Sequence, residues 1–196
     1  LFLSIKHNQN INTIGIYINE IILNNKHNLI DKCASLICCN SNIKTIALIV
    51  ENSIDSSSIF INKFIDSLSK SSIVNLCISY NKHLAQVDSL GNKFLASLKK
   101  IKLESLFLNK LCFKQDYKKV FFQEISKTQN KLNIFAFQDD CLTVDNASYI
   151  VSTLSKLPEL TTICVGMDKS NIYDELSNEL SLVCNKGKEG KKKEVY

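Results

Sequence analysis

The sequence predicts an α/β fold in which one strand–helix unit is repeated along the chain. Three observations indicate this: an apolar triplet that returns at nearly constant spacing, a polar residue that follows most triplets, and amphipathic helix patterns between them. A period of about 30 residues is typical of a solenoid, in which each unit packs only on its neighbours. We therefore expect a solenoid with one parallel sheet and helices on one side of it only.

The triplet has the form apolar-x-x-apolar-x-apolar. It begins at Ile11, Ile43, Ile73, Leu103, Leu132 and Leu160. Successive starts lie 28 to 32 residues apart. Because side chains alternate along a strand, the fourth and sixth positions of each unit point into the same core. The triplets predict six parallel strands over residues 13–17, 45–49, 75–79, 105–109, 134–138 and 162–166.

The ninth position of the unit is polar in most repeats. Four units hold Asn19, Asn81, Asp140 and Asp168 there. A fifth has Glu51 next to Asn52, and only Leu111 departs. An asparagine at this point has donors and an acceptor, so it can satisfy backbone groups where the chain leaves the strand.

The stretches between the triplets predict amphipathic helices with apolar residues at i, i+3 and i+4. The expected core faces are Leu29, Cys33, Leu36 and Ile37; Phe60, Phe64, Ile65 and Leu68; Leu90, Phe94, Leu95 and Leu98; Val120, Phe121 and Ile125; and Ile150, Val151, Leu154 and Leu157. We expect Asp116 and Asp145 to be N-caps and Pro158 to end the fifth helix. On the side of the helices that points away from the sheet, which is the convex side, we expect ordinary solvated side chains at Lys63, Lys70, Lys99, Lys100, Lys114, Lys118 and Lys119.

With its L-x-x-L-x-L-x-x-N pattern at residues 73–81, the chain resembles the leucine-rich repeat family. It is most similar to the longer, helix-bearing repeats of the ribonuclease-inhibitor kind, over roughly residues 11–183. The resemblance implies a horseshoe with the parallel sheet on the concave side and the helices on the convex side. It implies no activity, because members of the family mostly bind other macromolecules and differ in what they bind. The alternative is an ordinary α/β domain with evenly sized units.

A chain of 196 residues has room for one continuous core. We expect a degenerate N-terminal cap or truncated repeat at residues 1–10 and six repeats over residues 11–184. A flexible basic tail is expected at residues 185–196, which hold five lysines and two glutamates. Because the chain begins at Leu1, we expect it to be processed or cut from something larger.

The composition argues against several classes of function. The net charge is +5, but the chain has no arginine, which supplies the bidentate contacts used in specific nucleic-acid recognition. No apolar run is long enough to span a membrane. The three histidines are not spaced to bind a metal with each other or with cysteine. There is no Gly-rich phosphate loop and no G-x-S-x-G motif, so we expect no enzyme activity, no cofactor and no metal.

The eight cysteines include no C-x-x-C pair. Their distribution predicts small buried hydrophobic residues with reduced thiols in a cytoplasmic protein. A disulfide remains an alternative for Cys112 and Cys141, which would be neighbours across a strand spacing of about 4.8 Å.

The concave wall is the predicted binding surface. Residues between the core positions are mostly small and uncharged there, and four large apolar or aromatic side chains stand out among them. The partner-binding residues are predicted to be Tyr17, Ile49, Ser79, Phe107, Asn109, Ile134 and Gln138. Alternatively, Tyr17 and Ile49 are covered by the N-terminal segment.

These inferences predict a non-enzymatic, monomeric module that recognises a partner protein through its concave face. The repeat type and the Lys/Asn/Ile-rich composition are similar to those of leucine-rich repeat effectors that intracellular bacteria or parasites deliver into host cells. An alternative is the substrate-recognition part of an enzyme, such as a ubiquitin ligase, whose catalytic domain lies outside this chain. A third is a solenoid that encloses an active site with a reactive cysteine.

Overall fold

Strands and helices alternate along the part of the chain that the structure describes. This computed structural model describes residues 10–18, 27–50, 62–80, 88–111, 113, 115–139, 142–166 and 194–195. The strands are β1 Thr13–Ile18, β2 Thr45–Val50, β3 Asn75–Tyr80, β4 Ser105–Asn109, β5 Ile134–Gln138, β6 Thr162–Gly166 and β7 Glu194–Val195. The helices are α3 His27–Cys39, a segment at residues 62–68, α5 Asp88–Leu98, α6 Gln115–Thr128 and α7 Val144–Leu154.

All the strands join one parallel sheet in which the spatial order follows the sequence order. The six predicted strands are present, and the first three extend one residue further than predicted. Of the predicted tail, Glu194–Val195 pairs with β6, and the rest lies outside the described residues. The prediction of a cap at residues 1–10 also lies almost wholly outside them.

The register aligns equivalent positions of every unit. Leu48 lies opposite Ile78, which lies opposite Leu108 in turn. The entry to each strand repeats as well: the backbone oxygen of Lys44 accepts bonds from the N–H groups of Val74 and Asn75, at 2.9 and 3.0 Å. The backbone oxygens of Asn12, Val74, Glu104 and Asn133 also each accept hydrogen bonds from two consecutive N–H groups. Each unit is therefore set against the next in the same way.

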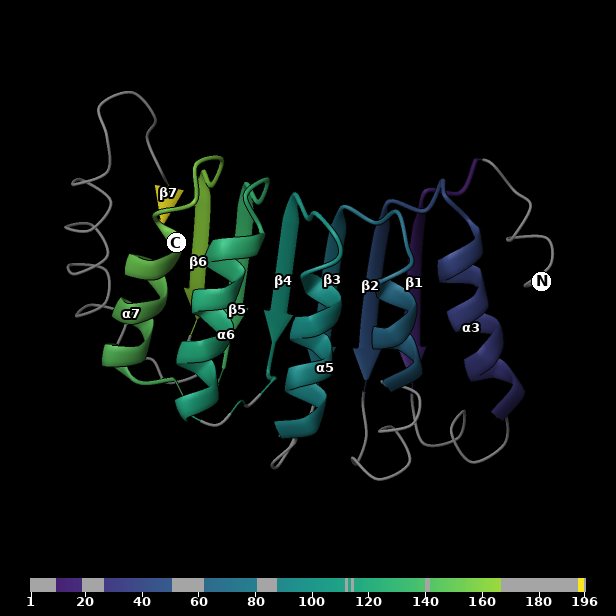
Figure 1. The fold of residues 1–196 in the computed structure, drawn as a ribbon, viewed down its shortest axis with the longest axis horizontal. Helices are drawn as coiled ribbons and strands as arrows, with labels where there is room; N and C mark the ends of the chain where they lie inside the picture. The colour runs from purple at the N-terminus through teal and green to yellow at the C-terminus, as the bar shows by residue number, and fades with distance from the viewer. Residues whose placement is uncertain are drawn as a thin grey trace.

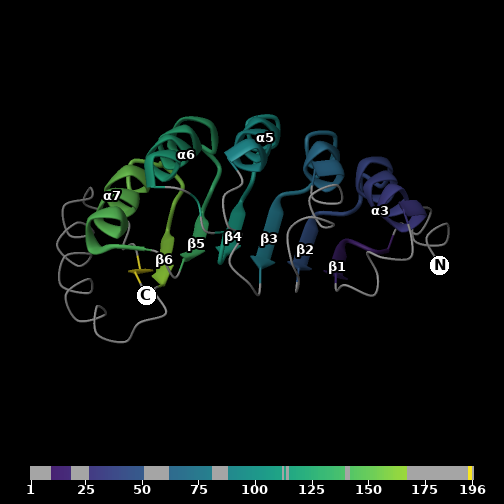
Figure 2. The same cartoon turned by 90° about the horizontal axis from the view of Figure 1, so that it is seen from below.

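The described helices all cover the same face of the sheet (Figure 1). Seen from below, strands and helices follow two nested arcs, with the helices on the outer side (Figure 2). The opposite face of the sheet, here called the open face, lies on the inner side of this curve. Side chains at the third, fifth and seventh positions of each unit point to the open face, because those at the fourth and sixth point to the helices.

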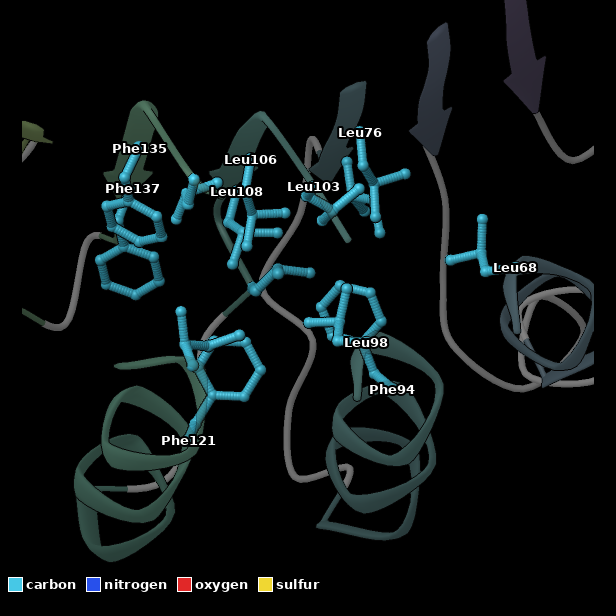
Figure 3. Close-up of a cluster of buried hydrophobic side chains, with 14 of the residues drawn as sticks. Leu68, Leu76, Phe94, Leu98, Leu103, Leu106, Leu108, Phe121, Phe135 and Phe137 are labelled. Carbon is cyan, nitrogen blue, oxygen red and sulfur yellow. The ribbon is translucent and has the colours of Figure 1, made fainter. Parts of the chain in front are cut away.

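The hydrophobic core fills the layer between the sheet and the helices (Figure 3). Phe121 on α6 packs edge-on against Phe122, with ring centroids 5.3 Å apart. Phe122 in turn meets Phe135 and Phe137 of β5 edge-on, at 5.8 and 5.1 Å. Such edge-to-face contacts between aromatic rings add stability beyond their buried area.

Two predictions for α6 are wrong. Val120, expected in the core, is 50% exposed, and Lys118, expected in solvent, is buried. The helix buries a stripe formed by Lys118, Phe121, Phe122 and Ile125. Val120 lies two residues after Lys118, about 200° around the helix axis, and therefore points outward.

Two predicted helix caps are also wrong. The N-cap of α7 is Thr143, whose Oγ1 accepts a hydrogen bond from the N–H of Asn146 at 3.3 Å. Asp145 instead lies in the first turn, where its charge favours the positive end of the helix. Asp116 lies inside α6, which begins at Gln115. The fifth helix ends at Leu154, four residues before Pro158.

Candidate functional site

The open face of the sheet carries three positions on each of the six long strands. They are occupied by Thr13, Gly15, Tyr17, Thr45, Ala47, Ile49, Asn75, Cys77, Ser79, Ser105, Phe107, Asn109, Ile134, Ala136, Gln138, Thr162, Cys164 and Gly166. None of these side chains is a lysine, aspartate or glutamate, although such residues make up 22% of the sequence. The open face is therefore uncharged from β1 to β6, and Glu194 of β7 lies in register with Thr162 at one edge of the sheet.

Four large apolar or aromatic side chains project from this face. Tyr17 is 48% exposed, Phe107 38%, and Ile49 and Ile134 37% each. Among the described residues, the other exposed large hydrophobic side chain is Val120, which lies on α6 on the opposite side of the sheet. Exposure of large apolar groups costs free energy in water, so a cluster of them on one face marks a contact surface.

The four side chains form two pairs. Tyr17 and Ile49 lie directly opposite each other in the register of β1 and β2. They form the first apolar patch. Phe107 lies opposite Ala136, and Ile134 lies opposite Ser105, so Phe107 and Ile134 are diagonal neighbours on β4 and β5. They form the second apolar patch.

Strand β3 separates the two patches with small and polar side chains, and these are bonded to their neighbours along the sheet. Asn75 Nδ2 donates to Thr45 Oγ1 at 3.1 Å, and Ser105 Oγ donates to Asn75 Oδ1 at 2.6 Å. Asn109 Nδ2 donates to Ser79 Oγ at 3.0 Å. These bonds fix the side chains of Asn75, Ser105 and Asn109 before any partner arrives.

One acceptor on the face is left over. Asn109 Oδ1 is buried and has no hydrogen-bond partner within the part of the chain that the structure describes. A buried acceptor without a partner is unfavourable for the folded state. Gly15 has open space in front of it, because a Cβ added there would meet no atom within 4 Å.

The predicted binding residues are thus brought onto one surface. Ser79, Asn109 and Gln138 occupy one row with Tyr17 and Ile49, at the seventh position of their units. Binding by these seven residues stays a prediction. The alternative, that the N-terminal segment covers Tyr17 and Ile49, concerns residues outside the described ranges.

The described cysteines have free thiols. Burial raises the pKa of the Cys33 and Cys77 thiols above the ordinary value, which disfavours the reactive thiolate. Burial is also the main cause of the raised pKa of Cys38, to which Cys39 adds and which Lys70 opposes. None of these three thiols is therefore activated as a nucleophile. Cys112 and Cys141, the candidate disulfide, lie outside the described residues.

Within the same described ranges, no group of three or more histidine, cysteine and acidic side chains is placed to hold a metal ion. None of the described helices is both long enough and apolar enough to cross a membrane. No family model matches this chain, and no curated protein matches it at a significant level of similarity.

Proposed function

We propose that this chain is a leucine-rich repeat solenoid of the ribonuclease-inhibitor kind and acts as a non-enzymatic module that binds a partner protein through its open face. The observation that carries this proposal is the pair of exposed apolar patches on a sheet face that is otherwise small and uncharged. Such side chains become the energetic centre of an interface once a partner excludes water from them.

The repeated geometry supports the solenoid part of the proposal. Consecutive units pair through the same register. At the start of five successive strands, two consecutive N–H groups donate to one backbone oxygen of the preceding unit. The described helices lie on the outer side of the arc (Figure 2). An ordinary α/β domain more often has helices on both faces of a parallel sheet and a strand order that reverses.

The rigidity of the face supports the binding part. Its side chains stand on paired strands, and hydrogen bonds hold Asn75 and Asn109 in place. Ordering this surface therefore costs little conformational entropy when a partner binds, and preorganisation of this kind raises affinity. The four apolar side chains lose their unfavourable contact with water at the same time.

Photo-cross-linking tests this proposal. The photoreactive amino acid p-benzoylphenylalanine is placed at Gly15, where the open face has space, and in a control at Gln123, which is exposed on α6. Each variant is irradiated in an extract of cells that produce the chain. We expect a protein adduct from the Gly15 variant, its loss when Phe107→Ala is added, and no such adduct from the Gln123 variant. Equal adducts from both positions, or none from Gly15, would contradict binding through the open face.

A further inference from the structure

We infer that the segment of the partner that docks on the open face is an amphipathic α-helix with an uncharged contact face and apolar anchors about three turns apart. This inference rests on the proposed function. It follows from three properties of the face: its lack of charge, the internal use of its polar groups, and the separation of its two apolar patches.

The lack of charge restricts the contact side of the partner. A partner carboxylate or ammonium group placed on the face would lose its hydration and find no opposite charge at any of the eighteen positions. Desolvation of an unpaired charge costs several kcal/mol, so charged side chains are excluded from the contact. Apolar and small polar side chains carry no such cost.

The hydrogen bonds within the face favour a helix over an extended segment. A strand can add to a sheet at its edge, but every strand from β2 to β6 is already paired on both sides. An extended segment lying flat on the face would need side-chain partners for its own N–H and C=O groups. Asn75, Ser105 and Asn109 each use one donor within the face, which leaves few for a partner backbone, whereas a helix satisfies its backbone internally.

The spacing of the patches fits a helix. Tyr17 and Phe107 are three strands apart and differ by two positions along the strand, which separates them by about 16 Å. Three turns of an α-helix also rise about 16 Å, so residues i and i+11 on one helix face meet both patches.

The curvature argues against a second copy of this chain as the occupant. The open face lies on the inner side of the arc, so two copies placed face to face would touch at their ends and leave their centres apart (Figure 2). A single helix is narrow and spans only β1 to β4, so it can enter the inner side of the arc, where a second curved sheet of the same width cannot.

The inference is tested with two phage-displayed libraries selected against the full chain. One presents helical hairpins that are randomised on a single helix face, and the other presents random extended peptides. We expect the helical library to yield binders with uncharged contact faces and apolar residues at i and i+11. These binders should lose at least about tenfold in affinity on Tyr17→Ala and on Phe107→Ala. The matched control, Val120→Ala, truncates an exposed apolar residue on the helix side and should leave their affinity unchanged.

A pair of substitutions at Gly15 tests the lack of charge directly. Asparagine and aspartate have nearly the same size, and the site has space for either. Gly15→Asp should weaken the selected helices at least about tenfold more than Gly15→Asn does, because only aspartate brings an unpaired charge into the contact. Equal effects of the two substitutions, or tighter binding to the aspartate variant, would overturn the inference.

The outcomes separate this inference from the proposed function. Helical binders with charged contact faces would overturn the inference. Extended peptides that alone depend on Tyr17 and Phe107 would also overturn it, while leaving the open face as a binding surface. If binders from both libraries are insensitive to these substitutions, the inference fails and the proposed function loses its main support.

Discussion

Lys118 and Asp139 form an ion pair inside the protein, with Nζ of Lys118 2.6 Å from Oδ2 of Asp139. Their side chains are only 2% and 0% exposed, between α6 and the end of β5. Equivalent positions on the first two strands hold the buried apolar residues Ile18 and Val50. The same position of the repeat is therefore apolar in the first two units and charged in the fifth. Each partner of such a pair depends on the other, because a single buried charge is costly.

We expect Lys118→Ala to destabilise the protein by about 3–5 kcal/mol, because it leaves the carboxylate of Asp139 buried and unpaired. The double variant Lys118→Met with Asp139→Leu removes both charges and should recover most of that loss. Urea unfolding of the three proteins measures the effect. Lys119→Ala, on the exposed side of the same helix, is the control and should change little. A similar loss from the Lys119 and Lys118 variants would contradict the buried pair.

Two adjacent residues of β4 test the register of the sheet. Leu106 is fully buried and Phe107 is 38% exposed on the open face. Leu106→Ala should cost about 2–5 kcal/mol, because it leaves a cavity in the core. Phe107→Ala should cost less than about 1 kcal/mol, although it removes the larger side chain. Thermal and urea unfolding compare the two variants, and a larger loss for Phe107→Ala would show that the strand faces the other way.

Gln129 holds the turn between α5 and β4 by three hydrogen bonds. Its Nε2 donates to the backbone oxygens of Leu98 and Ile101 at 2.6 and 3.1 Å, and its Oε1 accepts from the N–H of Leu103 at 3.0 Å. Gln129→Ala should destabilise strongly, since each buried group left without a partner costs about 1–3 kcal/mol.

The matched control is Gln123→Ala, which truncates the same residue type at an exposed position of α6. Unfolding in urea should show little change for this variant. If Gln129→Ala changes the free energy of unfolding as little as Gln123→Ala does, the prediction is wrong, and water has replaced the hydrogen bonds of Gln129.

Glu124 predicts an acid-dependent loss of stability. Hydrogen bonds from Lys99, which directly follows α5, and from Lys127 lower the pKa of its carboxyl from 4.5 to about 2. The folded state therefore holds the ionised form more strongly than the unfolded state does. The resulting stabilisation is present above pH 4.5 and is lost as the pH falls towards 2.

Urea unfolding between about pH 6 and pH 2 measures this dependence. Glu124→Gln should be less stable than the wild type at the upper end of this range and approach it at the lower end. High salt should reduce the difference, because the lysine partners are exposed. A constant difference across this range would show that Glu124 acts through packing rather than charge.

The strands could be predicted from the sequence because burial imposes a strict alternation on them. Leu76 and Ile78 must both reach the core, so the triplet fixes which face Cys77 and Ser79 occupy. Applied to the first two units, the same alternation predicts that Tyr17 lies beside Ile49, as the register of β1 and β2 confirms. The exposure of the four large side chains on the open face follows from this register.

The helix layer could not be predicted as well, because α6 offers two overlapping apolar stripes. One contains Val120 and the other contains Phe122, and Lys118 shares the second. Lysine is so rarely buried that its presence favours the wrong stripe. Only its partner, Asp139 at a core position of the next strand, indicates the correct one. Likewise, the hydrogen bonds of Gln129 join segments that the sequence does not show to be in contact.

The sequential order of the strands also determines how the protein unfolds under a stretching force. Within the described sheet, each strand is hydrogen-bonded only to the strands that precede and follow it in the chain, so no described strand pair joins distant units. A force applied to the two ends therefore meets one unit interface at a time, and the chain extends by one repeat at each step. The unit interfaces should separate one after another under force, and the interface with the least buried apolar surface should separate first.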